Sequence, residues 1–198
     1  MKILAFVDVH ENKSAMKKLI EKSKDVDLLI CAGDISVWGS NLSNLIKSFK
    51  ATNKKLLIIP GNHEDEIELK EICSNFDFVF YLHKRSIKIN NYLFFGHGTG
   101  GFAKINKDFE KVGERFKKII KNEKVIFVSH APPYNTKLDI LINDHYGCKS
   151  YSDFILQVKP ILCVCGHFHE NSGVSDKLGK TFVINPGPYG QIIDLEKI

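Results

Sequence analysis

The stretch KLLIIPGNHE, residues 55–64, decides the fold of this chain. Lys55–Ile59 is a short apolar run, and Gly61 follows it at a point where the backbone must turn sharply. The next segment, Asp65–Cys73, carries apolar residues at helical spacing, namely Ile67, Leu69 and Ile72. The stretch therefore predicts a buried strand, a tight turn bearing polar side chains, and a helix.

The same unit occurs twice before this stretch. Apolar runs at Lys2–Val7 and Asp27–Ala32 are each followed by a segment of helical spacing, Ser14–Lys24 and Asn41–Lys50 respectively. Strands that read as continuous apolar runs are buried on both faces, which is typical of parallel sheets built from βαβ units. The first half therefore predicts an α/β fold.

The second half is richer in strands. A lysine-rich helix is expected at Asn106–Asn122, and the longest candidate loop is Tyr134–Lys149. Strands are expected at Phe78–Tyr81, Ser86–Ile89, Tyr92–Phe95, Lys124–Ser129, Ile161–Cys165, Thr181–Ile184 and Gln191–Leu195. No internal repeat or linker divides the chain, so residues 1–198 are expected to form a single domain.

Composition excludes several classes of protein. Hydrophobic residues make up 43% of the 198 and charged residues 26%, which is ordinary for a globular protein. No apolar run approaches the ~18 residues of a membrane span, and the N-terminus does not resemble a signal peptide, so we expect a cytoplasmic protein. The net charge of +5 is nearly all lysine, which argues against a sequence-specific DNA reader. The scattered cysteines are interpreted as reduced and structural: Cys31, Cys73, Cys148, Cys163 and Cys165.

Metal-binding residue types follow five of the expected strands. They are Asp8 and His10, then Asp34 after Gly33, then Asn62 and His63 after Gly61, then His130, then His167 and His169 after Gly166. In open α/β sheets the functional site lies beyond the carboxyl ends of the strands. All these side chains are therefore expected at one rim.

The ordered set of motifs resembles the calcineurin-like metallophosphoesterase superfamily, and most closely its small single-domain members related to cyclic-nucleotide phosphodiesterases. Asn185-Pro186-Gly187 also resembles the C-terminal signature of that family. The resemblance implies a four-layer α/β/β/α sandwich of two mixed sheets. It also implies two metal ions, one held by Asp8, His10 and His169 and the other by Asn62, His130 and His167, with Asp34 bridging both.

The ligand chemistry agrees with this implication. Mixed imidazole and carboxylate ligands suit divalent transition metals, with Mn as the first choice and Fe, Zn or Ni as alternatives. The expected reaction is in-line attack on phosphorus by a hydroxide that bridges the two metals. His63 is expected beside the substrate phosphate, where it would protonate the leaving oxygen.

Several functional assignments remain open from the sequence. The first choice of substrate is a phosphodiester, such as a small or cyclic nucleotide, and the alternatives are a phosphomonoesterase, a nuclease on the same site, or a non-catalytic scaffold of this fold. His97 and His145 are candidates for contact with substrate, although a loop at the site rim and a structural role, respectively, are the plainer interpretations. His83 is interpreted as a surface residue. Trp38 follows the turn after Asp34. Some members of the resembling family carry a further aspartate or arginine in that turn, and this sequence has neither, so their specificity does not transfer to this chain.

Overall fold

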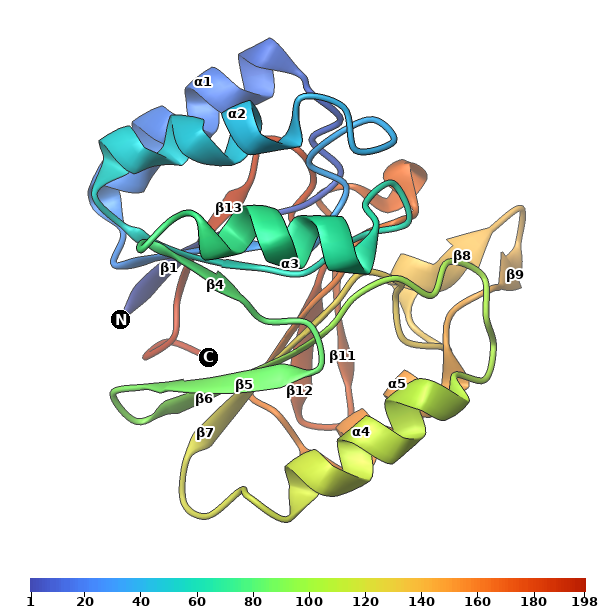
Figure 1. Ribbon diagram of the computed structural model, residues 1–198. Coiled ribbons are helices and arrows are strands. Elements are labelled where there is room, and N and C mark those ends of the chain that lie inside the picture. The colour runs from blue at the N-terminus through green and yellow to red at the C-terminus, as the bar shows by residue number, and fades with distance from the viewer.

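The computed structural model describes residues 1–198 as two facing sheets with helices on both outer sides (Figure 1). The first sheet has five strands in the order β13-β1-β2-β3-β4. All of its pairings are parallel except that of β13 with β1, so the sheet is mixed. Its strands are β1 (Lys2–Phe6), β2 (Leu28–Cys31), β3 (Lys55–Ile58), β4 (Val79–Tyr81) and β13 (Gln191–Asp194).

The second sheet has six strands in the order β11-β12-β10-β7-β6-β5. Its inner pairings are parallel, and the edge strands β5 and β11 are antiparallel to their neighbours. Its strands are β5 (Arg85–Ile89), β6 (Tyr92–His97), β7 (Lys124–Ser129), β10 (Leu162–Val164), β11 (Ser175–Leu178) and β12 (Thr181–Ile184). A small separate hairpin joins β8 (Ile140–Leu141) to β9 (Asp144–His145).

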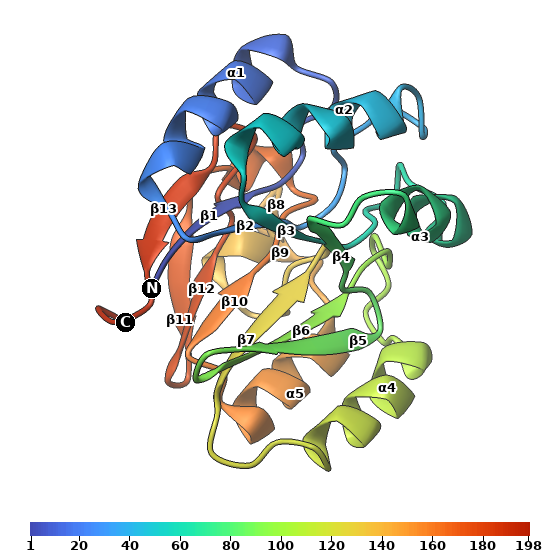
Figure 2. The ribbon, with the colours of Figure 1, turned by 60° about the vertical axis from the view of Figure 1, so that its left-hand side comes forward.

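Helices cover the outer face of each sheet, as Figure 2 shows from a second direction. Over the first sheet lie α1 (Lys13–Lys22), α2 (Leu42–Ser48) and α3 (Glu66–Ser74), and over the second lie α4 (Lys107–Lys117) and α5 (Lys149–Val158). Three of the helices begin at side-chain caps: Asn12, Asp65 and Asn106 each accept hydrogen bonds from backbone N–H groups of the first turn.

Three apolar clusters hold the four layers together. Alternate residues of β1 divide between two of them: Leu4 and Phe6 pack under the helices, whereas Ile3 and Ala5 pack between the sheets. The third cluster joins the second sheet to α4 and α5. The central strands are therefore buried on both faces, which is why they read as unbroken apolar runs. The predicted four-layer sandwich of two mixed sheets is confirmed.

Some predicted elements differ from the structure. The helix expected to run to Asn122 ends at Lys117, and no helix was predicted at α5. The expected loop Tyr134–Lys149 contains the β8–β9 hairpin, and β11 was not predicted. The five cysteines are all free and buried, as expected. Each of the helices is too short or too polar to cross a lipid bilayer.

Candidate metal centre

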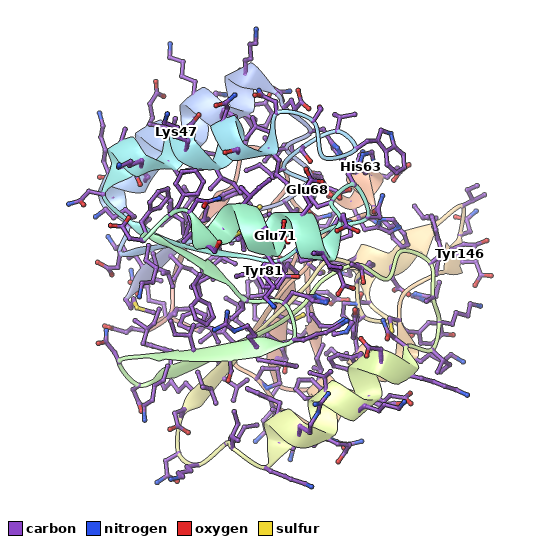
Figure 3. All side chains as sticks on the ribbon, in the orientation of Figure 1. Lys47, His63, Glu68, Glu71, Tyr81 and Tyr146 are labelled. Carbon is purple, nitrogen blue, oxygen red and sulfur yellow. The ribbon has the colours of Figure 1, made fainter.

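Five loops at the carboxyl ends of β1, β2, β3, β7 and β10 bring the predicted ligands together. Figure 3 shows His63 at this rim, on the side where Tyr146 marks the base of the β8–β9 hairpin. Several loop residues have left-handed backbone, which non-glycine residues adopt rarely, namely Asp8, His10, Asp34 and His167. Such conformations concentrate at functional sites, where the surrounding structure enforces them.

A close approach of two loops sets the middle of the site. A Cβ on Gly33 would lie 2.5 Å from the backbone N of Gly61 and 2.9 Å from Nδ1 of His130. Gly33 also has a φ of +99°. Only glycine fits both restrictions, and its presence lets the loops after β2 and β3 meet.

The first candidate ligand group contains Asp8, His10 and His169. Their ligand atoms lie within 4.8 Å of one another. The Nε2 atoms of His10 and His169 are 3.1 Å apart, and Asp8 Oδ1 lies 3.8 Å from His169 Nε2. Asp8 is buried, yet its Oδ1 has no hydrogen-bond partner. Burial raises the pKa of this carboxyl group, so a cation beside Oδ1 would relieve an unfavourable environment.

The second candidate group contains Asn62, His130 and His167. Asn62 Oδ1 lies 2.9 Å from His130 Nε2 and 2.8 Å from His167 Nδ1. His130 is fully buried, and its Nδ1 lies 2.9 Å from the carbonyl oxygen of Ala32. Because a carbonyl oxygen only accepts, Nδ1–H donates to it and Nε2 is left to face the site.

Asp34 lies between the two groups. Its Oδ2 is 3.7 Å from His10 Nε2 and 3.4 Å from His130 Nε2. Its Oδ1 accepts a hydrogen bond of 2.9 Å from the backbone N–H of His63. Burial acts to raise the pKa of Asp34, but the hydrogen bond and charge of His130 lower it to about 2. Burial likewise opposes protonation of His130, but Asp34 raises the pKa of that ring to about 9.

These residues fit two divalent transition-metal ions. Nitrogen and oxygen donors face one another across short gaps. Asp34 also belongs to two further groups of close donors, one with His10 and His63 and one with Asp8 and His130. One donor, Asp8 Oδ1, is buried and unpartnered, which is costly unless a cation binds it. The neutral Asn62 adds a donor without adding charge, and mixed imidazole and carboxylate sets favour transition metals.

His63 lies beside the candidate ligands. The His63 and His10 rings meet edge to face at 4.7 Å between centroids, and a ring nitrogen of His63 is close enough to His10 and Asp34 to join a metal group. Its Nδ1 accepts a hydrogen bond of 3.3 Å from the backbone N–H of Trp38. In the neutral ring the proton therefore lies on Nε2.

Glu64 organises the site, a role that was not predicted from the sequence. Its Oε2 accepts hydrogen bonds from the backbone N–H groups of Asp34 and Gly61, at 2.8 and 2.9 Å. Its Oε1 accepts from the N–H and hydroxyl of Ser36. A buried carboxylate thus ties the loop after β2 to the loop after β3. The signal was present, because an acidic residue directly follows Asn62 and His63.

The C-terminal Asn185-Pro186-Gly187 motif braces the loop that bears His167 and His169. Asn185 Nδ2 donates to the carbonyl oxygen of Phe168, and the carbonyl oxygen of Gly187 accepts from the N–H of Val7. The motif therefore links the loop after β10 to the residue that follows β1.

The other histidines lie outside the ligand groups. His97 is buried at the end of β6, with Nδ1 2.9 Å from the Tyr151 hydroxyl. His145 Nδ1 lies 2.7 Å from Asp139 in the β8–β9 hairpin. The interpretation of His83 as a surface residue is wrong: it is buried, and its Nδ1 accepts a 2.7 Å hydrogen bond from Gly98.

Comparisons with known proteins identify the family of the chain. A sequence profile described as calcineurin-like phosphoesterase matches residues 1–171. The chain is 33% identical over 200 residues to the uncharacterized protein MJ1162 of Methanocaldococcus jannaschii, covering 95% of this chain and 88% of that protein.

Three solved structures are similar in fold. The protein TT1561 of Thermus thermophilus aligns with a TM-score of 0.83 at 18% identity, covering 99% of this chain and 95% of that chain. A dimetal phosphatase from Danio rerio aligns at 0.66 and 10% identity, covering 92% and 86%. An archaeal phosphodiesterase aligns at 0.55 and 21% identity, covering 100% and 95%. The profile match over most of the sequence and the fold shared with phosphoesterases lead to one conclusion: the chain belongs to the calcineurin-like phosphoesterase family.

Proposed function

We propose that this protein is a metal-dependent hydrolase of phosphodiesters and that its substrates are small molecules, with small or cyclic nucleotides as the first choice. Asp8, His10 and His169 would hold one divalent ion, and Asn62, His130 and His167 the other. The observation that carries the proposal is the place of Asp34, whose Oδ2 lies between His10 Nε2 and His130 Nε2. Manganese is the ion we expect to bind in both places.

When bound, two such ions polarise the phosphoryl oxygens and lower the pKa of a water for attack on phosphorus. The protein's own groups complete the reaction. His63 carries its proton on Nε2, because Nδ1 accepts from Trp38. It would donate a hydrogen bond from Nε2–H to the leaving oxygen and stabilise the charge that develops there, while the proton itself comes from solvent, since transfer from the neutral ring would leave an imidazolate. Its N–H···Oδ1 bond to Asp34 fixes this histidine relative to the ligands.

The chain's residues favour this proposal over its alternatives. Every ligand position is filled by a metal-binding side chain, which argues against a scaffold that has lost its metals. Only Arg85 and Arg115 are available for bidentate phosphate contacts, which argues against a nuclease that tracks nucleic acid. The site is accessible from solvent, since His169 is 60% exposed. The choice of a diester over a monoester rests on the resemblance to the group related to cyclic-nucleotide phosphodiesterases, since a fold does not set the substrate. A phosphomonoesterase remains the rival within the same chemistry.

The test compares bis-p-nitrophenyl phosphate with p-nitrophenyl phosphate on protein stripped with chelator and reloaded with Mn²⁺. The proposal expects metal-restored cleavage that favours the diester, and loss of at least about 100-fold in Asp34→Asn and His130→Ala. The exposed Glu71→Gln serves as the matched control. Faster cleavage of the monoester would show that the protein is a phosphatase rather than a phosphodiesterase. Bound metal with no cleavage of either ester would contradict the hydrolase.

A further inference from the structure

Trp38 is exposed at the rim of the candidate metal centre. It is the only tryptophan of the chain, and 75% of its surface is open to solvent. An indole ring offers a large, rigid apolar face with one polar N–H, so an exposed one beside a catalytic group is well suited to contact a ligand.

The ring is held against His63. The two ring centroids are 4.3 Å apart and the planes are inclined by 31°, while the backbone N–H of Trp38 donates to His63 Nδ1. The backbone of Trp38 is left-handed, with φ of 51°. This conformation is strained for a bulky residue, and it keeps the indole next to the imidazole.

The turn that carries Trp38 is fixed on both sides. Before it, Ser36 is bound by Glu64 through both its N–H and its hydroxyl, and Val37 N–H donates to Glu11 Oε1 at 3.2 Å. After it, the Ser40 hydroxyl donates to the carboxylate of Glu11 as well. An aromatic surface on a fixed turn is pre-organised, so a ligand that stacks on it loses little free energy to ordering the loop.

The place of the ring indicates which part of a substrate would meet it. His63 is the group proposed to donate a hydrogen bond from Nε2–H to the leaving oxygen, so the leaving group of the ester must lie beside it. Trp38 packs on that same imidazole and extends from it into solvent. A flat group attached to the leaving oxygen is thus within reach of the indole.

We propose that Trp38 is a specificity-determining residue, whose exposed indole stacks on a planar aromatic group, such as a nucleobase, in the leaving portion of the phosphate ester. This inference rests on the proposed function and names the feature of the substrate that the site selects. Stacking of this kind accepts any base, because every base offers a π-face. The contact therefore favours esters whose leaving group carries an aromatic ring over sugar phosphates and alkyl phosphates. It does not favour one base over another.

Fluorescence of the sole tryptophan reports this contact directly, apart from turnover. The Mn²⁺-loaded protein is titrated with adenosine 5′-monophosphate and with ribose 5-phosphate, which has the same phosphate and sugar but lacks the aromatic base. The proposal expects quenching by the nucleotide and none by the sugar phosphate at saturation. Competition with bis-p-nitrophenyl phosphate should show the nucleotide binding about tenfold more tightly.

Variants of Trp38 distinguish the contribution of its aromatic ring from that of the turn that carries it. Trp38→Ala should bring the two ligands to equal affinity, whereas Trp38→Phe should keep most of the difference. Tyr189→Ala is the matched control, because this ring is also exposed and its recorded ring contact is with Lys18 of α1. Equal affinity of both ligands for the natural protein, or an unchanged preference in Trp38→Ala, would overturn the proposal while leaving the hydrolase intact. Quenching by the nucleotide in a protein that cleaves neither ester would instead overturn the hydrolase and keep the stacking site.

Discussion

The carboxylate of Glu64 accepts the backbone N–H of Asp34 at 2.8 Å and so fixes the residue that we propose to bridge the two metal ions. The same carboxylate holds Gly61 and Ser36. A carboxylate is suited to this role because it only accepts, and all its partners here donate.

Glu64→Gln should therefore weaken both the fold and the metal centre. The amide would turn an NH₂ group toward backbone N–H donors and leave buried groups unpaired, which costs about 1–3 kcal/mol of unfolding free energy. Mn²⁺ affinity should fall by about 10- to 100-fold. Chemical denaturation and isothermal titration measure the two effects, with the exposed Glu71→Gln as control. Metal binding as tight as in the natural protein would show that Glu64 is dispensable for the site.

Metal removal should lower thermal stability. Two ions that bind only the folded chain at about 100 times their dissociation constant stabilise it by about 2.7 kcal/mol each, and a single such ion corresponds to a rise in Tm of about 5–10 °C. Differential scanning calorimetry with chelator and with Mn²⁺ measures the rise. Asp34→Asn should lose most of it, whatever its own metal-free Tm. A full Mn²⁺-induced rise in this variant would remove Asp34 from the ligand set.

Gly33→Ala should be among the most damaging small substitutions. Both Gly33 and Gly173 have left-handed φ, at +99° and +84°, so alanine costs backbone strain of about 1–3 kcal/mol at either position. Only at Gly33 would the new Cβ also meet backbone, whereas at Gly173 the nearest atom is 4.0 Å away. Urea denaturation should show Gly33→Ala to be less stable than Gly173→Ala by at least about 1 kcal/mol. Equal losses would mean that the loops can separate freely.

The buried His97 should make the metal-free protein sensitive to acid. Burial lowers the pKa of His97 to about 4, and the neighbouring His83 acts in the same direction against the opposing effect of Asp108. The unfolded chain takes up the proton near pH 6.5, so His97 stabilises the fold above that pH. This contribution, on the order of 3 kcal/mol, is lost as pH falls through about 4. Denaturation in urea from pH 7 to pH 4 should show a shallower decline in His97→Gln, and an identical decline would contradict the assignment.

The parallel strands and the rim were predictable for a physical reason. Neighbouring residues such as Leu29 and Ile30 pack into apolar clusters on opposite faces of the sheet. Because both faces are buried, the successive residues of such a strand are all apolar. The polar groups that follow, including Asp34 and His130, then fall at the carboxyl ends by topology alone. Metal binding by the proposed ligand set stays a prediction, which the experiments above test.

What escaped prediction depends on contacts between distant segments. Lys84 and Arg85 follow His83 in the sequence, and contacts with distant residues, such as Gly98 and His97, bury it. Strand β11 alternates exposed and half-buried residues at a sheet edge, which leaves no strong apolar pattern. In contrast, α5 was detectable, because Tyr151, Phe154 and Ile155 lie at helical spacing. The helix was missed because a long loop was expected up to Lys149.

The division of the candidate ligands between the two sheets has a consequence for synthesis of the chain. Asp8 to Asn62 follow strands of the first sheet, whereas His130 to His169 follow strands of the second. A nascent chain released before His130 would carry four of the seven candidate ligands, and the edge of β1 that β13 covers would stay open. Hydrolytic activity would therefore require synthesis of the chain as far as His169. A product that terminates before this residue would be inactive.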